Sequence, residues 1–179
     1  MIQAIQRRLA ARKENGEGGF TLIELMVVVM IIAILIGIAI PAFLGARKRA
    51  QDTASKSDLR NGLSTAQTIF TDNQAYKDTG DMVTELNGEE PSLNFLANTA
   101  ASTTSKEISV LVTQSAVTGS TANDEIILAS QSKSGTCFFL RHINTAGDAT
   151  LSGSYTAEST GTCTADAGAA LADTAWTAA

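Results

Sequence analysis

The sequence predicts an α+β fold in which one long N-terminal helix, over about residues 20–72, packs on a small antiparallel sheet of about four strands. Two observations predict the helix: residues 20–44 are almost uniformly apolar, and an amphipathic helical pattern follows them directly. A third observation predicts the sheet, because short apolar runs separated by turn residues occupy the C-terminal half of the chain.

The apolar run from Phe20 to Leu44 is long enough to cross a bilayer. A helix of its 25 residues is about 37 Å long at ~1.5 Å per residue, while the hydrocarbon core is about 30 Å thick. The run is too long for the apolar part of a secretory signal peptide, and no small-residue cleavage site follows it. Basic residues flank both ends, so their count alone leaves the orientation open.

Glu24 is the one ionisable side chain within this apolar span. A charge at the bilayer centre costs about 3 kcal/mol or more, so a residue of this kind indicates a function and a partner. The alternative is a glutamate that reaches the headgroup region near the start of the helix, where a negative charge also suits the helix dipole.

The segment GGFTLIEL, residues 18–25, resembles the class III signal of type IV pilins and pseudopilins. The resemblance comprises a short basic leader, glycine followed by Phe20, Glu24 four residues further on, about twenty apolar residues, and Pro41 where pilins commonly carry a proline. Close similarity covers residues 18–75. It implies that a prepilin peptidase cuts between Gly19 and Phe20 and methylates the new amino group of Phe20.

The resemblance also implies the type IV pilin fold and its topology. Residues 1–19 would be a cytoplasmic leader, residues 20–45 a membrane anchor that becomes the filament core, and residues 46–179 an exported head. The implied partners are further copies of the chain in a helical homopolymer, the prepilin peptidase and methyltransferase, an inner-membrane platform protein, an assembly ATPase, and the membrane before assembly. The expected location is the inner membrane for the single-pass precursor and then an extracellular filament.

By the same resemblance, Glu24 pairs in the filament with the N-terminal amine of Phe20, on a neighbouring subunit or on its own. Buried ion pairs often only offset their own desolvation, so this pair would set the register of assembly more than it would add stability.

Gly37 and Pro41 mark a weak point in the span. Proline removes one backbone hydrogen bond and clashes with the carbonyl four residues earlier, here that of Gly37, so the helix is expected to kink or loosen over residues 34–41. The resemblance adds that this part melts in the assembled fibre. An ordinary proline kink explains the sequence equally well.

The head is expected to begin with an amphipathic helix, residues 46–72, followed by an αβ-loop at 73–105 that includes a short helix near 92–97. A sheet over residues 106–157 follows, with antiparallel meander connections and turns near 119–123 and 134–135. The candidate strands alternate apolar and polar positions or are short apolar runs: residues 106–114, 125–130, 136–143 and 150–156.

The only two cysteines are Cys137 and Cys163, both in the expected head. Their spacing fits no CxxC motif, and an oxidising exterior permits a disulfide, which would bound a C-terminal region at 137–163. Two free thiols are the alternative. Trp176, the one large group of the tail, either docks the tail on the head or leaves it disordered.

No catalytic or metal-binding set, and no cofactor, is predicted. His142 is the only histidine, and no triad or metal-ligand pattern accompanies it. Acidic residues between 78 and 90 fit no EF-hand spacing. The chain carries a net charge of −5, and without residues 1–19 it has 9 basic against 16 acidic residues, or −7. This charge argues against indiscriminate nucleic-acid binding by the head.

Three functions fit the sequence. The first is a pilin that polymerises through its N-terminal helix into a type IV pilus used for adhesion, motility or DNA uptake. The second is a type II secretion-type pseudopilin or a minor pilin. The third is a monomeric single-pass membrane protein whose head binds a partner, which would need neither Glu24 nor cleavage at Gly19.

Overall fold

The computed structural model describes residues 19–114, 123–144, 153–171 and 173–179. The chain divides into two units, Met1–Gly45 and Ala46–Ala179. Residues 1–18 of the predicted leader, and most of the turn predicted near 119–123, lie outside the described residues.

Helix α2 runs from Leu22 to Asn73. The long N-terminal helix predicted from the sequence is confirmed, and it begins and ends within two residues of the predicted limits. The helix continues without interruption through residues 34–41, because Pro41 removes only one backbone hydrogen bond and the neighbouring bonds remain. Kinking or melting of this segment in the filament stays a prediction.

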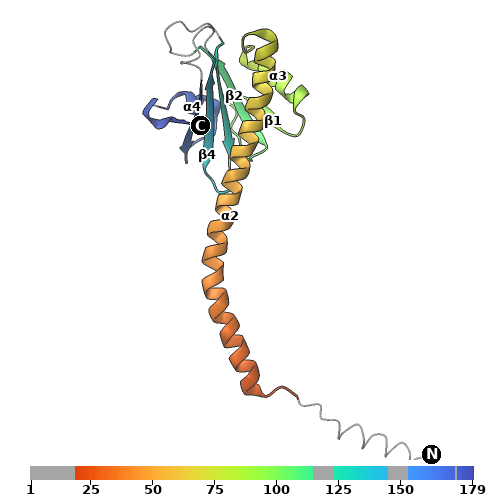
Figure 1. The fold of residues 1–179 in the computed structure, drawn as a ribbon, viewed down its shortest axis with the longest axis vertical. Coiled ribbons are helices and arrows are strands. Elements are labelled where there is room, and N and C mark those ends of the chain that lie inside the picture. The colour runs from red at the N-terminus through yellow and green to blue at the C-terminus, as the bar shows by residue number, and fades with distance from the viewer. Residues whose placement is uncertain (1–18, 115–122, 145–152, 172) are drawn as a thin grey trace, which may run out of the picture. The chain divides into compact units, whose positions relative to one another are not determined.

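The residues that the structure describes form ten helices and strands. The sheet lies in the unit Ala46–Ala179 (Figure 1). After α2 they are α3 Thr79–Glu89, β1 Asn94–Ala97, β2 Glu107–Thr113, β3 Glu125–Gln131, β4 Cys137–Ile143, β5 Gly153–Ser159, α4 Ala165–Ala169, the 3-10 helix Asp173–Ala175 and β6 Thr177–Ala178. The strands lie in sequence order in one sheet, β1-β2-β3-β4-β5-β6. β1 and β2 are parallel and all other neighbours are antiparallel.

Two details of the predicted sheet are wrong. Among the described residues the sheet has six strands rather than about four, and it is mixed rather than antiparallel. The short helix predicted near 92–97 is strand β1, whose Phe95 is aligned with Ile108 of β2. A strand of four residues has too little sequence for a period to appear, so the pairing with β2 decides its conformation. Helix α3 was also missed within the predicted loop 73–105; it buries Met82 and Leu86, one turn apart.

One face of the sheet carries the main core. The predicted apolar stripe of α2 packs there, with Leu59, Leu63 and Ala66 buried and Phe70 partly buried. Their partners come from α3 and from alternate positions of the strands: Met82, Leu86, Phe95, Ile108, Val110, Ile126, Leu128, Phe138 and Leu140. Gly62 allows this close approach, since an added Cβ would lie 3.1 Å from the ring of Phe95.

The opposite face of the sheet carries a smaller core around a disulfide. Cys137 of β4 is bonded to Cys163, and both are buried with Phe139. Helix α4 packs so closely that a Cβ on Gly168 would lie 2.7 Å from the Phe139 ring. Trp176 is half-buried against this cluster, so the C-terminal segment docks on the head.

The outer edge of β1 is occupied by a side chain. Asn87 of α3 donates from its Nδ2 to the carbonyl of Phe95 at 3.0 Å and accepts the Phe95 N–H on its Oδ1 at 2.9 Å. The amide thereby makes the pair of bonds that another strand would make with Phe95. Asn87 therefore occupies the hydrogen-bonding groups of the β1 edge at Phe95, the buried residue of this strand.

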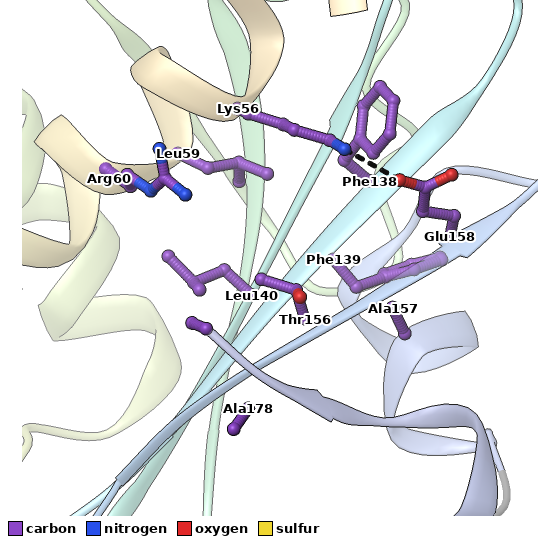
Figure 2. Close-up of a pocket in the computed structure, with 11 residues that line it drawn as sticks. Lys56, Leu59, Arg60, Phe138, Phe139, Leu140, Thr156, Ala157, Glu158 and Ala178 are labelled. Atoms are coloured by element: carbon purple, nitrogen blue, oxygen red, sulfur yellow. Dashed lines mark hydrogen bonds and ion pairs between the residues drawn. The ribbon is translucent and has the colours of Figure 1, made fainter. Parts of the chain in front are cut away.

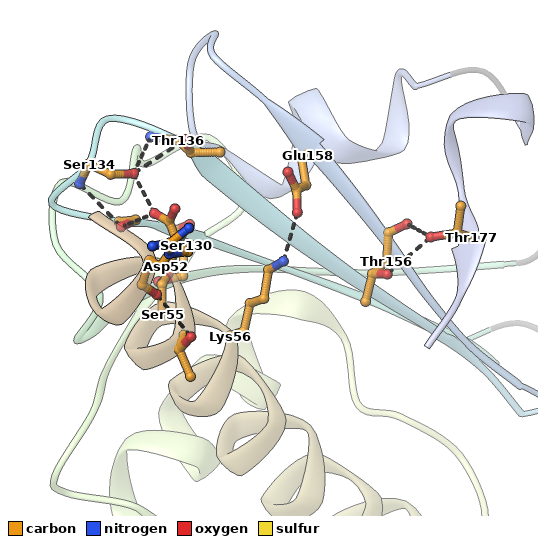
Figure 3. A network of polar contacts seen from close by, with 12 residues as sticks. Asp52, Ser55, Lys56, Ser130, Ser134, Thr136, Thr156, Glu158 and Thr177 are labelled. Carbon is orange, nitrogen blue, oxygen red and sulfur yellow. Dashed lines mark hydrogen bonds and ion pairs between the residues drawn. The ribbon is translucent and has the colours of Figure 1, made fainter. Parts of the chain in front are cut away.

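A network of polar contacts connects α2, near Asp52 and Ser55, to the turn between β3 and β4 (Figure 3). Asp52 accepts hydrogen bonds from the hydroxyls of Ser132, at 2.7 Å, and Ser134. Burial raises the pKa of the Asp52 carboxyl, but these two hydroxyls and the nearby lysines outweigh it and hold the pKa below its usual value. One turn later, Ser55 lies 3.0 Å from the hydroxyl of Ser130.

Replacing Tyr76 by phenylalanine is expected to leave the head unchanged in stability or to stabilise it by about 1 kcal/mol. The side chain is 1% exposed, and its hydroxyl has no hydrogen-bond partner among the described residues. A buried hydroxyl without a partner costs about 1–3 kcal/mol, while the ring keeps its contact with Phe70 at 4.8 Å between centroids. Urea unfolding measures the difference. Tyr76→Ala is the control and is expected to lose about 3–5 kcal/mol; a Tyr76→Phe variant less stable by 1 kcal/mol would show a missed partner.

The stability of the head is expected to fall as the pH drops through about 6.5. His142 is buried, and its ring contacts Gln67 at 3.2 Å and Ser154 at 2.9 Å. Burial lowers the pKa of His142, so the unfolded chain takes up a proton at a higher pH than the folded chain does. The stabilising contribution is therefore complete above the ordinary pKa and is lost below it, with a slope of at most about 1.4 kcal/mol per pH unit. Unfolding curves between pH 5.5 and 7.5 should show this slope in the wild type and lack it in His142→Gln.

Candidate processing and assembly segment

Gly19, Phe20 and Thr21 precede the first helical residue, Leu22. Phe20 is 89% exposed, and Gly19 has nothing within 4 Å of the position of a Cβ. The Gly19–Phe20 peptide bond thus lies outside the helix and away from neighbouring side chains, a geometry that a protease can reach.

Thr21 and Glu24 form a capping box at the start of α2. The Thr21 Oγ1 accepts the Glu24 N–H at 3.2 Å. In return, Glu24 Oε2 accepts the Thr21 N–H at 3.2 Å and the Thr21 hydroxyl at 2.9 Å. Each residue satisfies a backbone donor that the first turn of a helix would otherwise leave unpaired.

The capping box changes the interpretation of Glu24. In the uncut chain Phe20 has no free amine, and the carboxylate is held by Thr21 instead, four residues from the predicted cut. The carboxylate is therefore already positioned at the end of the helix where cleavage would create a positive charge. Sequence reasoning found Glu24 but missed Thr21, although a threonine three residues before a glutamate at the head of an apolar run is the signal for this motif.

The rest of the segment offers a continuous apolar surface. The large side chains from Leu22 to Leu44 are 45–76% exposed, and the helix has a mean hydropathy of 3.1 over its most apolar window, none of it buried. By length and composition α2 is able to cross a membrane. Gly37, Pro41 and Gly45 recur along one side of it, and nothing lies within 4 Å of a Cβ placed on either glycine.

The head contains a cavity of about 200 Å³ between α2 and the end of the sheet (Figure 2). Its walls combine Lys56 and Arg60 of α2 with residues of β4, β5 and β6. Lys56 is paired with Glu158 at 2.7 Å and lies 4.6 Å from the centre of the Phe138 ring. No three metal-ligating side chains cluster within the described residues.

The candidate processing and assembly segment is similar to known proteins. The family model of the prokaryotic N-terminal methylation motif matches residues 15–40. The exposed Gly19–Phe20 bond, the capping box and the start of the apolar helix all lie within this motif.

Two curated relatives are similar to the N-terminal region of the chain. The chain is 47% identical over 58 residues to the "Type IV wide pilus major component PilA4" of Thermus thermophilus, covering 32% of this chain and 44% of the relative. It is 42% identical over 60 residues to the "Type IV major pilin protein PilA" of Myxococcus xanthus, covering 34% of this chain and 27% of the relative. The matches thus span less than half the length of these relatives, and no solved structure matches the chain. The N-terminal region of the chain is therefore similar to that of type IV pilins.

Proposed function

We propose that the protein is a structural subunit that polymerises through its N-terminal helix into a type IV pilus filament. The observation that carries this proposal is the long apolar surface of α2 from Leu22 to Leu44, which has no cover within the described chain. A bilayer covers that surface in a precursor, and neighbouring helices cover it in a polymer. Both relatives are described as major pilus components, which supports a major rather than a minor subunit.

The processing steps form part of the proposal. A prepilin peptidase cuts between Gly19 and Phe20, the amino group of Phe20 is methylated, and the head from residue 46 onward is exported. The new amine of Phe20 then competes with Thr21 for the carboxylate of Glu24. In the filament, neighbouring helices also shelter backbone groups released near Gly37 and Pro41.

The assembly partners follow from this route. They are further copies of the chain, a platform protein in the inner membrane and an assembly ATPase. The filament serves adhesion, surface motility or DNA uptake, and the subunit itself has a structural rather than a catalytic role. The protein resides in the inner membrane as a precursor and outside the cell as a fibre.

Electron microscopy and N-terminal sequencing together test the proposal. Surface fibres purified from a strain that expresses the chain should consist mainly of it and begin at a methylated Phe20. A Gly19→Leu variant, which obstructs cleavage, should accumulate as an uncut membrane protein without fibres. A cut chain that remains in the envelope and forms no fibres would overturn the proposal.

A further inference from the structure

Three consecutive basic residues lie on α2 directly after the apolar span: Arg47, Lys48 and Arg49. All three are exposed, and none forms an ion pair among the described residues. Consecutive helical residues point about 100° apart, so the three charges spread around more than half of the helix. We call them the basic patch; its own head leaves it open to a partner.

A groove between α2 and α3 has the opposite charge. It has a volume of about 300 Å³ and is lined by Asp72, Glu85 and Glu89, together with Ser64, Thr65 and Thr68. Glu85 is paired with Lys77 at 2.7 Å, whereas Asp72 and Glu89 are exposed and form no ion pair among the described residues. We call this the acidic groove. Asp81 lines a neighbouring hollow together with Lys77 and Glu85. Its carboxylate extends the negative charge beyond the acidic groove.

The basic patch and the acidic groove of one chain cannot meet. Both lie on the single helix α2, and Arg49 precedes Asp72 by 23 residues, a distance of about 35 Å at ~1.5 Å per residue. An ion pair needs its charged atoms within about 4 Å. The two surfaces are therefore available only to other molecules.

We propose that the basic patch of one copy docks in the acidic groove of another copy, staggered along the filament. This inference rests on the proposed function. The described head presents both complementary surfaces, so every copy can donate one contact and accept one, which suits an open polymer. The contact also offsets the mutual repulsion of heads, residues 46–179, which carry 9 basic against 15 acidic residues and thus a net charge of −6.

An anionic membrane surface is a poorer partner for the patch. In the proposed topology the patch lies on the exported side of the span, where basic residues are not favoured by the positive-inside rule. A headgroup would also leave the acidic groove without a counterpart, and the groove would be repelled by anionic lipid. A second copy of the chain supplies the opposite charge to both the basic patch and the acidic groove.

Charge reversal in the full-length protein tests the contact. Arg47→Glu with Arg49→Glu, or Asp72→Lys with Glu89→Lys, should each reduce surface fibres at least tenfold. Combining all four substitutions should restore fibres to near the wild-type level. The matched control is Arg60→Glu with Lys133→Glu, which makes the same charge change at two other exposed cations and should leave fibres intact.

The outcomes are separable. Fibres that persist in both reversed variants, or losses that the combination does not restore, overturn this inference while the pilin function stands. Wild-type cells that cut the chain but form no fibres overturn the proposed function instead. If only the basic reversal acts, and it leaves the chain uncut or wrongly inserted, the patch serves the membrane and the inference is wrong. A zero-length carbodiimide crosslink between Lys48 of one copy and Asp72 or Glu89 of another, mapped in wild-type fibres, gives a direct second reading.

Discussion

Replacing Glu24 by glutamine is expected to abolish filament assembly while cleavage at Gly19 and membrane insertion continue. Glutamine at this position still accepts from Thr21, as a capping box requires, so the substitution removes the charge and keeps the cap. In the proposed filament the amine of Phe20 would then be buried without its partner. Removing one partner of a buried ion pair costs about 3–5 kcal/mol, which corresponds to roughly a hundredfold or more in an association constant.

Immunoblotting for the cut chain and electron microscopy of fibres measure the two parts of this result. Thr21→Ala is the matched control, because it removes the cap and keeps the charge. We expect it to form fibres. Normal fibres from Glu24→Gln together with none from Thr21→Ala would mean that Glu24 acts through the cap of α2 and that no pairing with Phe20 occurs.

Removing the disulfide is expected to destabilise the head by about 3–4 kcal/mol. Cys137 and Cys163 are 26 residues apart, and cross-linking a loop of this size restricts the unfolded chain by roughly that amount in the chain-entropy model. The bond also holds the segment before α4 against β4, where both sulfurs are buried. Alanine at both positions avoids placing a hydroxyl in that core.

Thermal unfolding of the full chain in detergent measures this effect. Cys137→Ala with Cys163→Ala should lower the Tm by about 10 °C, and wild-type protein in reductant should fall to a similar value. Reductant should have no effect on the double variant. A Tm within about 2 °C of wild type would show that packing around Phe139, rather than the cross-link, holds this side of the head.

The sequence predicted well those elements whose conformation depends on a long pattern. The apolar run and the stripe at Leu59, Leu63 and Ala66 located α2, and alternating positions or short apolar runs located β2 to β5. Short elements failed, because pairing rather than local pattern decides them: β6 has two residues and aligns with Tyr155 and Thr156.

The candidate site could be read from the sequence only in part. Glu24 stood out because a charge in an apolar span is costly. The acidic groove could not be found from the sequence, because it forms only where the chain reverses direction after α2. Gln74 takes a positive φ of 58° at that reversal, and α3 then returns along α2 so that Glu85 and Glu89 lie near Asp72. The spacing of these acidic residues in the sequence does not predict that turn.

The amide of Asn87 limits how copies of this protein are able to join at the β1 edge. A sheet that ends in an open strand allows other copies to add strand to strand without limit. Here the bonding groups of Phe95 at that edge are already taken by Asn87. Growth by sheet extension is thereby blocked at Phe95 of β1, and in the proposed filament the copies join through their helical shafts instead.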